Sequence, residues 1–416
     1  MQKINGVIRL SASDLMRFKG CRHATTLDLR RLEIGDLEPA AEDAEAERLQ
    51  KQGDDHELGF LERLKADGRS VVEISKDGVT LEAAVTATAA ALAGGPDVVF
   101  QGAFLGGAWG GYSDFLERVE TPSALGGWSY EVVDTKLKRK PDPKHVLQLS
   151  LYSDLLAEAQ GVAPRAAHLQ LGDGSRFTVR LDDVSAYARQ SRRALERFVE
   201  ERPATLSEPV GACTLCRWRI VCRDEWEAAD GLPLIAGASR SQRAKLEAAG
   251  LTTMLGVAAR QGRIRGLAPE TQARLQAQAR LQSARRAGGP PAFELRAVEA
   301  GKGLSLLPEP DDGDLFYDIE GDPYYPEGLE YLHGVWFRSG GAWTFRAFWA
   351  HDREAEGRAV ADLLDFFVEH LRRHPGAHIY HYANYEVAAL RRLTASHRTG
   401  EGAMDQLQRE LSLIHI

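Results

Sequence analysis

The four cysteines of this chain are distributed unevenly along the sequence. Cys213, Cys216 and Cys222 fall within ten positions, whereas Cys21 lies near the N-terminus. Disulfides explain such cysteines poorly in a reducing cytosol, where this kind of spacing is more typical of metal binding or redox chemistry. Thiolate ligands need not be neighbours in sequence. A shared site therefore requires a fold that brings the start and the end of the first 222 residues together.

The length of the chain implies more than one domain. It has 416 residues, which at roughly 150 residues per domain predicts two or three domains. The N-terminal segment lacks the features of a signal peptide, and no apolar stretch is long enough to cross a bilayer. We therefore expect a cytoplasmic protein with no membrane partner. The net charge of -8 argues against a uniformly basic nucleic-acid-binding protein but leaves room for local basic surfaces.

Residues 1–228 read as an α/β domain. Helical signals run from an N-cap at Ser11 or Ser13 through DLMRFKGCRHATTLDLRRLE, and a charged, Ala-rich stretch follows. Short β-type runs alternate with Gly-rich turns, and a helix, a strand pair and a long final helix come after them. The β-type runs are VVEI at 71–74, DVVFQGAFL at 97–105 and YEVVDTKL at 130–137. The cysteine cluster closes this domain.

Three further segments complete the predicted organisation. Residues 229–287 form a basic helical region, in which ten Lys or Arg and two acids between Arg240 and Arg286 give a local charge of +8. Its pattern of short helical segments separated by glycines resembles a helix-hairpin-helix unit, which contacts phosphates without reading bases. Simple helical packing is the alternative interpretation. Residues 288–313 are expected to be a linker, and residues 314–416 a second α/β domain.

The most informative chemistry lies between residues 111 and 152. In the strand YEVVDTKL, Asp134 and Lys136 share one face because side chains two apart point the same way. Asp114, in GYSDFL, can meet Asp134 across a hairpin turned by SALGG. Two carboxylates can hold a divalent metal while a lysine supports the nucleophile or the developing charge. Gln148 and Tyr152 are spaced i, i+4 and project from one face of the next helix.

These residues resemble the RecB-type branch of the PD-(D/E)XK nuclease superfamily, whose signature is Asp, then Asp/Glu-x-Lys, then Gln-x-x-x-Tyr. The resemblance implies a central mixed sheet flanked by helices and a site that binds Mg²⁺ or Mn²⁺. It also implies a metal-binding histidine within a Gly-x-x-His element, which GDDH matches at His56. In isolation, each residue has a simpler interpretation as a turn cap, a surface ion pair or a solvated helix residue.

The cysteine layout, with C-x2-C-x5-C at the end of the domain, resembles the iron-sulfur cluster of AddB-type and CRISPR-associated relatives of RecB nucleases. The resemblance implies that Cys21, Cys213, Cys216 and Cys222 bind a 4Fe-4S cluster that fastens the two ends of the domain. A structural zinc site remains the alternative, because four thiolates also suit tetrahedral zinc.

The C-terminal region offers a second catalytic possibility. In DLFYDIEGD, Asp318 and Glu320 share a strand face, which resembles the start of the two-metal site in ribonuclease-H-like exonucleases of the DEDD type. HIYHYANYEVAAL resembles their second motif, with Glu386 in place of the usual aspartate. The last six residues, LSLIHI, stop in mid-pattern and match the translation of a sequencing-library adapter. We therefore expect this domain to be a truncated, partial one.

The sequence thus predicts a metal-dependent DNA nuclease, acting as an exonuclease on single strands or ends, in DNA repair or processing. RNA is a second candidate substrate, and the resemblance adds a helicase domain or subunit as a partner. A noncatalytic nucleic-acid-binding adaptor is one alternative function. The other is 3′–5′ exonuclease activity from the ribonuclease-H-like domain.

Overall fold

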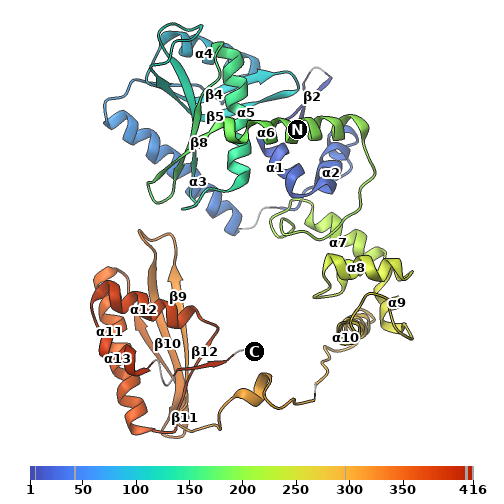
Figure 1. The fold of residues 1–416 in the computed structure, drawn as a ribbon, viewed down its shortest axis with the longest axis vertical. Helices are drawn as coiled ribbons and strands as arrows, with labels where there is room; N and C mark the ends of the chain where they lie inside the picture. The colour runs from blue at the N-terminus through green and yellow to red at the C-terminus, as the bar shows by residue number, and fades with distance from the viewer. Residues whose placement is uncertain (5, 42–43, 296, 408–410, 415–416) are drawn as a thin grey trace. The chain divides into compact units, whose positions relative to one another are not determined.

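The computed structural model describes residues 1–4, 6–41, 44–295, 297–407 and 411–414. The chain divides into two compact units, Met1–Glu294 and Leu295–Ile416 (Figure 1). Both units are α/β, in agreement with the predicted fold class. The division falls inside the segment 288–313 that the sequence predicts to be a linker. The helices among the described residues are too short or too polar to cross a membrane.

A six-stranded mixed sheet forms the centre of the first unit, with the strand order β3-β4-β5-β6-β7-β8. The β3–β4 and β6–β7 pairs are parallel and the other pairs are antiparallel. The strands are β3 (Val71–Glu73), β4 (Val98–Gly106), β5 (Trp109–Val119), β6 (Ser129–Lys136), β7 (Ala166–Leu171) and β8 (Arg176–Arg180). The predicted hairpin through SALGG is present as the β5–β6 connection. A separate two-stranded pair joins β1 (Gln2–Ile4) to β2 (Val7–Arg9).

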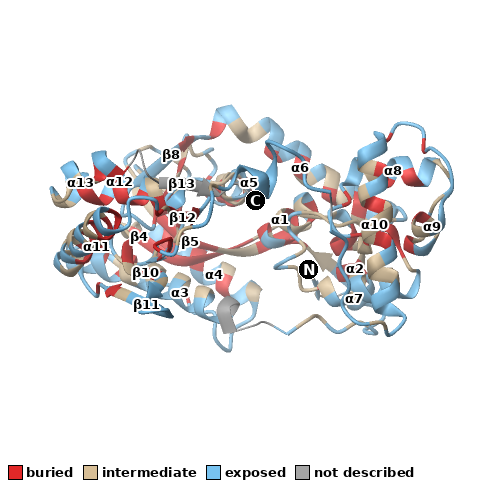
Figure 2. Cartoon of the chain, turned by 90° about the horizontal axis from the view of Figure 1, so that it is seen from below, coloured by how far each residue is buried: buried red, intermediate tan, exposed pale blue. Residues whose placement is uncertain are grey.

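Helices cover both faces of this sheet. They are α1 (Ala12–Gly20), α2 (Arg22–Glu33), α3 (Ala44–Ala66), α4 (Leu81–Gly94), α5 (Pro143–Gln160) and α6 (Leu181–Glu201). On one face, Phe60 and Leu61 of α3 pack against Phe115 and Val133 of the sheet. On the other face, residues of α1, α4, α5 and α6 form the larger core. Figure 2 shows the buried residues concentrated on the strands and on the inward sides of the helices.

The predicted N-terminal helix is in fact two helices. The sequence predicts either Ser11 or Ser13 as the N-cap, and the structure shows Ser11. Ser11 forms a reciprocal capping box with Asp14. The helical run breaks at Cys21, whose extended backbone (φ -160°, ψ 114°) ends α1 and begins α2. An ideal Cβ on Gly20 would lie 3.6 Å from the Cβ of Ala212, so the break lies against the segment that carries the other cysteines.

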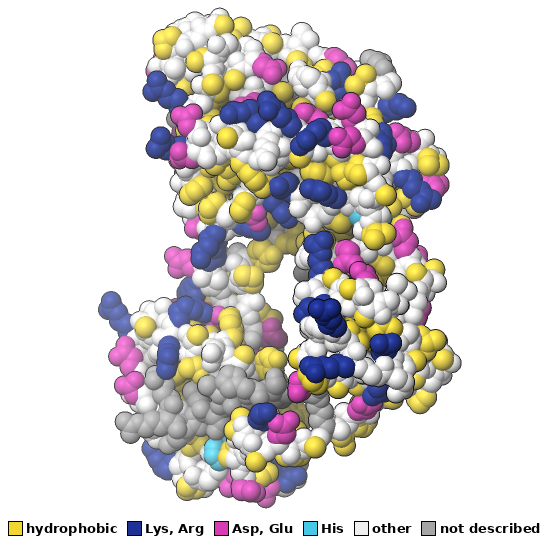
Figure 3. Space-filling model, turned by 45° about the vertical axis from the view of Figure 1, so that its right-hand side comes forward, with side chains coloured by type: hydrophobic (Ala, Val, Ile, Leu, Met, Phe, Trp, Pro, Cys, Tyr) yellow, Lys and Arg dark blue, Asp and Glu magenta, His cyan; other side chains and the backbone are white. Residues whose placement is uncertain are grey.

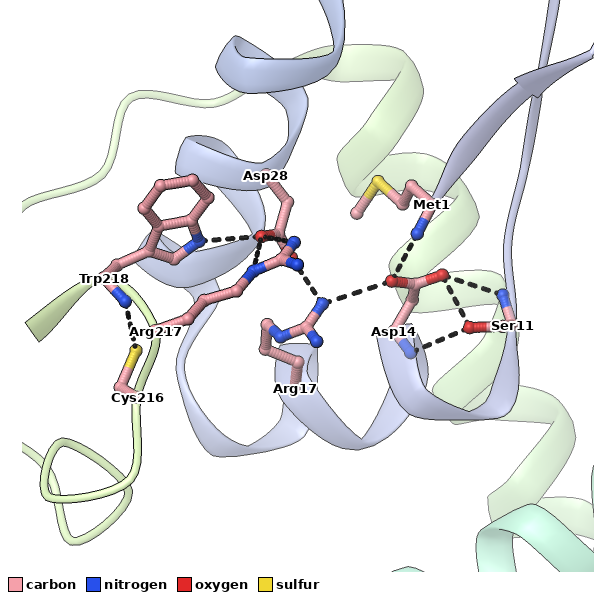
Figure 4. Close-up of polar contacts among 8 residues, drawn as sticks. All are labelled: Met1, Ser11, Asp14, Arg17, Asp28, Cys216, Arg217 and Trp218. Atoms are coloured by element: carbon pink, nitrogen blue, oxygen red, sulfur yellow. Dashed lines mark hydrogen bonds and ion pairs between the residues drawn. The ribbon is translucent and has the colours of Figure 1, made fainter. Parts of the chain in front are cut away.

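The buried carboxylate of Asp28 joins the two ends of this domain (Figure 4). Its Oδ1 accepts hydrogen bonds from Trp218 Nε1 at 2.7 Å and from Arg217 Nε at 3.0 Å. Its Oδ2 accepts one from Arg17 Nη1 at 2.7 Å, and the same Arg17 nitrogen lies 3.3 Å from Asp14 Oδ1. Asp28 therefore connects helices α1 and α2 to the cysteine-rich segment near residue 218.

The remainder of the first unit is helical. It contains α7 (Arg219–Ala228), the 3-10 turn η1 (Leu232–Leu234), α8 (Arg240–Ala248), α9 (Met254–Ala259) and α10 (Pro269–Arg286). A small apolar core of its own includes Leu246, Met254, Ile264 and Leu275. The basic region therefore forms a packed helical layer, with the glycine turns between its helices as predicted.

The second unit contains a five-stranded sheet in the order β11-β10-β9-β12-β13. Its elements are the 3-10 turn η2 (Gly303–Leu306), β9 (Leu315–Asp322), β10 (Leu329–Ser339), β11 (Ala342–Trp349), α11 (Arg353–Arg373), β12 (Ile379–Tyr382), α12 (Tyr385–His397), α13 (Glu401–Leu407) and β13 (Leu411–Ile414). Residues of α11, α12 and α13 share one apolar core with β9 and β10. The predicted truncation at LSLIHI lies partly outside the described residues, which omit 408–410 and 415–416.

We predict that Asp28→Ala destabilises the first unit by about 3 kcal/mol, because it leaves a buried indole N–H and two guanidinium groups without their acceptor. Calorimetry of the full chain should show a lower melting temperature for one transition. Asp36→Ala is the matched control, since Asp36 also pairs with an arginine, Arg30, but at the exposed surface. A loss no larger than that of the control would contradict the role assigned to Asp28.

Candidate active site

The two predicted carboxylates lie opposite each other on neighbouring strands. Phe115 of β5 pairs with Val133 of β6, so the next position in the antiparallel register places Asp114 opposite Asp134. Phe115 and Val133 pack toward α3, and alternation therefore directs the two aspartates to the opposite face. Asp114 Oδ2 accepts a hydrogen bond from the backbone N–H of Thr135 at 3.1 Å, which fixes that carboxylate against β6.

Lys136 and Gln148 contact the two oxygens of Asp134. Lys136 Nζ lies 2.6 Å from Asp134 Oδ2, and Gln148 Nε2 donates a hydrogen bond to Asp134 Oδ1 at 3.0 Å. Gln148 reaches the strand because α5 begins at Pro143, after the N-cap Asp142, and packs on this face of the sheet. The structure therefore brings together Asp114, Asp134, Lys136 and Gln148, as the sequence motif predicts.

Burial and like charge make this pair of aspartates electrostatically costly. Asp134 is 1% exposed, and burial together with the charge of Asp114 raises its pKa well above the usual range. Burial alone would lower the pKa of Lys136, but the charges of Asp134 and Asp114 outweigh it and raise that pKa. One ammonium thus faces two close carboxylates, an arrangement that a divalent cation would relieve.

Tyr152 lies one helical turn beyond Gln148 and also reaches the site. An ideal Cβ on Gly111 of β5 would lie 2.7 Å from the Tyr152 hydroxyl, so only glycine leaves room for that contact. Burial and the charges of Asp114 and Asp134 raise the pKa of Tyr152. The hydroxyl therefore stays protonated and can donate a hydrogen bond beside the two carboxylates.

Glu57 lies on α3, which covers the other face of the sheet, and interacts electrostatically with Asp114 and Lys136. Its carboxylate accepts a hydrogen bond from Gln101 Nε2. Gln101 falls opposite Asp114, between the Phe100–Phe115 and Gly102–Ser113 pairs, and has a positive φ of 58°. Burial, followed by the charge of Asp114, raises the pKa of Glu57 to about 7. Glu57 therefore lies within the electrostatic field of the aspartate pair.

The sequence motif drew attention to His56, one residue earlier. The Nε2 atom of His56 is buried without a hydrogen-bond partner. Among the contacts that the structure describes, none joins His56 to Asp114 or Asp134. The signal that could have identified Glu57 is helical spacing, because positions 57, 61 and 64 share one face and Leu61 and Leu64 are buried.

His145 is a second residue that the motif did not indicate. It lies in the first turn of α5, and its Nδ1 is buried without a hydrogen-bond partner. Burial and the charge of Lys136 lower its pKa to about 4. A neutral imidazole thus stands near the ammonium of Lys136 at physiological pH.

The second unit presents its own acidic pair. Asp318 and Glu320 lie on the exposed face of β9 and line a cavity of about 540 Å³ together with Phe316, Trp336 and Phe345. Glu386 is placed differently. It is buried at the start of α12, with its carboxylate 3.4 Å from His381 Nδ1. In the described part of the chain, no contact joins Glu386 to the other two acids.

Comparison with protein families assigns both parts of the chain. Residues 26–223 match the PD-(D/E)XK nuclease superfamily, and residues 315–416 match the RNase H superfamily. The chain therefore contains a region matching PD-(D/E)XK nucleases and, later in the sequence, a region matching RNase H. These two domains place it among nucleases, the hydrolases that cleave phosphodiester bonds of nucleic acids. A comparison with curated proteins finds no match.

PD-(D/E)XK nucleases use divalent metals, and the residues of this nuclease domain suit one. Asp134 Oδ2 accepts no well-directed hydrogen bond, and Asp114 and Glu57 add further oxygen ligands of the kind Mg²⁺ and Mn²⁺ prefer. Within the residues that the structure describes, no three His, Cys, Asp or Glu side chains are arranged closely enough to hold a metal ion. Asp114 and Asp134 thus lie opposite each other without forming a closed coordination shell.

The four cysteines of the nuclease domain converge on one cavity of about 160 Å³. Cys213 Sγ accepts a hydrogen bond from the Val210 N–H at 3.3 Å, and Cys216 Sγ accepts one from the Trp218 N–H at 3.4 Å. Such donors stabilise thiolate ligands. Burial raises the pKa of Cys216, and burial with the charge of Glu225 raises that of Cys222 to about 12. All four are free cysteines that line this one cavity, although within the described residues they are not grouped closely enough to form a complete metal site.

We predict that Glu57 makes the stability of the metal-free protein depend on pH. Its folded pKa of about 7 exceeds the usual 4.5, so between these values the folded state binds more protons than the unfolded state. The free energy of unfolding should therefore fall as the pH rises from 4.5 to 7. Melting temperatures measured in EDTA should show a weaker fall for Glu57→Gln.

Glu47→Gln is the matched control for this experiment, because Glu47 is an exposed residue of the same helix. It should retain the pH dependence of the wild type. Mg²⁺ or Mn²⁺ added at pH 8 should raise the melting temperature of the wild type more than that of Glu57→Gln. If the melting temperatures of Glu57→Gln and the wild type depended on pH in the same way, the role assigned to Glu57 would be wrong.

Proposed function

We propose that the chain is a divalent-metal-dependent DNA nuclease of RecB type, whose phosphodiester hydrolysis takes place at Asp114, Asp134 and Lys136. The observation that carries the proposal is the pair of opposed aspartates on β5 and β6 with the Lys136 ammonium 2.6 Å from one of them. This arrangement matches the Asp and Asp-x-Lys elements of the superfamily motif. The proposed substrates are single strands or ends of DNA, with RNA as the second candidate.

Each residue has a chemical role in this proposal. Asp114 and Asp134, with Glu57 and His56 from α3, would hold Mg²⁺ or Mn²⁺. The metal would lower the pKa of an attacking water and offset charge on the scissile phosphate.

Gln148 holds the Asp134 carboxylate in orientation through its hydrogen bond. Lys136 carries a proton, because its pKa is raised, so its positive charge is available to the phosphate as negative charge develops. Tyr152 supplies a neutral hydroxyl beside the carboxylates.

A second candidate activity belongs to the RNase H domain. Asp318 and Glu320 are exposed, share a strand face and line the cavity of about 540 Å³, which favours 3′–5′ exonuclease chemistry there. In this proposal Glu386 would be the third acidic ligand. Its burial beside His381 means that it would have to turn toward β9 to take part.

The wider biological setting is also a proposal. RecB-type nucleases act in DNA repair or processing, and a helicase domain or subunit would supply the unwound strand to such an enzyme. The chain would act in the cytoplasm. A noncatalytic adaptor is the remaining possibility, and it is distinguished from the nuclease by the cleavage assay below.

The test is cleavage of end-labelled single- and double-stranded DNA and RNA with Mg²⁺ or Mn²⁺. We expect Lys136→Ala to lower the rate by about 10²-fold or more, because it removes the charge that stabilises the transition state. Lys3→Ala, which removes an exposed lysine of the same unit, should leave the rate unchanged.

Asp318→Ala distinguishes the two domains in this assay. Loss of cleavage in Asp318→Ala but not in Lys136→Ala would assign the activity to the RNase H domain. Folded protein that binds nucleic acid but cleaves none of these substrates with either metal would favour the adaptor. The end-labelled product ladder would give the polarity of digestion.

We further propose that the four cysteines bind a 4Fe-4S cluster that closes the nuclease domain. The convergence of all four sulfur atoms on one cavity supports this proposal. Anaerobically purified protein should contain iron and acid-labile sulfide and absorb visible light broadly, and Cys21→Ser should lose both the iron and the absorption. Colourless protein with stoichiometric zinc would establish the zinc alternative.

A further inference from the structure

The loop between α9 and α10 of the basic helical region is held unusually firmly for an exposed turn. Gln272 of α10 accepts a hydrogen bond from the Ile264 N–H at 2.8 Å and donates one to the Gly262 carbonyl at 2.9 Å. Gln276, one turn later, donates to the Arg260 carbonyl at 2.8 Å. Two glutamine side chains therefore fix the backbone of residues 260–266, which we call the arginine loop.

Apolar anchors determine which side chains of the arginine loop face solvent. Ile264 is 1% exposed and packs into the small core of the helical region. The flanking residues Arg263 and Arg265 are exposed, as is Arg260. An ideal Cβ on Gly266 would lie 3.6 Å from the side chain of Lys245, so a fourth cation lies beside the loop. Figure 3 shows Lys and Arg side chains on the surface of this part of the molecule.

These four cations differ from three other arginines of the region, each of which pairs with a carboxylate. Arg243 pairs with Glu208, Arg280 with Glu294 and Arg286 with Asp230. Across the part of the chain that the structure describes, no carboxylate pairs with the exposed cations of the loop. The cations concerned are Lys245, Arg260, Arg263 and Arg265.

Unpaired cations held on a fixed backbone cost electrostatic energy in the free protein, and a polyanion would relieve that cost. The two acids of the segment, Glu247 and Glu270, are both exposed and pair with none of these cations. Because the backbone is already fixed by Gln272 and Gln276, little conformational entropy would be lost on binding. Exposed guanidinium groups of this kind suit phosphate oxygens, which they can contact without reading bases.

We propose that the arginine loop, together with Lys245, is a binding surface for the phosphodiester backbone of nucleic acid, distinct from the catalytic carboxylates. It holds a strand in a sequence-independent manner, whether or not cleavage takes place. The choice of nucleic acid over other polyanions rests on the nuclease domain in the same compact unit.

The test is binding without cleavage, measured in EDTA by fluorescence anisotropy with labelled single-stranded DNA, duplex DNA and RNA over a range of salt concentrations. Arg263→Ala/Arg265→Ala should reduce the slope of log affinity against log salt by about 1.4 for single strands and about 1.8 for duplex, from the release of two phosphate contacts. Affinity at low salt should fall for all sequences alike.

Arg31→Ala/Arg165→Ala is the matched control, because it removes the same charge at two exposed sites of the same unit. It should keep the wild-type slope. Arg263→Lys/Arg265→Lys should also keep most of the slope, because both positive charges remain. Binding measured in EDTA does not depend on cleavage. Failure of the nuclease proposal therefore leaves this result unaffected.

Equal slopes for the Arg263→Ala/Arg265→Ala variant and its control would overturn the proposal. If the alanine variant does not fold, Arg263→Gln/Arg265→Gln is judged by the same criterion. Vesicles containing phosphatidylserine provide the other arm of the test. Loop-dependent binding to vesicles, with no loop-dependent binding to any of the three nucleic acids, would replace nucleic acid by an anionic lipid surface.

Discussion

The antiparallel register between β5 and β6 is the constraint on which the nuclease site depends. Because Phe115 pairs with Val133, Asp114 must face Asp134 on the opposite side of the sheet from α3. A shift of one strand by one residue would turn its carboxylate toward Phe60 and Leu61 in the apolar core and separate it from the other. The apolar packing of this hairpin thus places the two carboxylates of the proposed site, and α5 then brings Gln148 and Tyr152 to them.

The site that results carries more negative charge than its own lysine can balance. Asp114, Asp134 and Glu57 face a single ammonium, that of Lys136. The raised pKa values of Asp134 and Glu57 mean that burial and like charge destabilise the ionised carboxylates in the absence of a cation. A fold that keeps Asp114 and Asp134 close together despite that cost suits a divalent metal, which is consistent with the nuclease superfamily that residues 26–223 match.

A second constraint closes the domain. The buried carboxylate of Asp28 bonds to Trp218 and Arg217, which are about 190 residues later in the chain. These contacts hold the cysteine-rich segment against α1 and α2, and the break between those helices places Cys21 at the same cavity as the other three cysteines. The protein contacts by themselves therefore bring the four cysteines to one cavity.

The sequence by itself determined the mixed α/β fold, the order of most helices and strands, and the convergence of Asp114, Asp134, Lys136 and Gln148. These features follow from local patterns, namely residue alternation in strands, i, i+4 spacing and turn residues, which act over short distances along the chain. The sequence did not separate α1 from α2, because the break at Cys21 follows Gly20, which lies against Ala212, a residue remote in sequence. It also favoured His56 over Glu57, since a short motif does not report which residue of a helix faces a sheet. Only the tertiary structure decided the place of Glu57, of His145, of the buried Glu386 and of the glutamines that hold the arginine loop, because each depends on packing between segments that no local pattern connects.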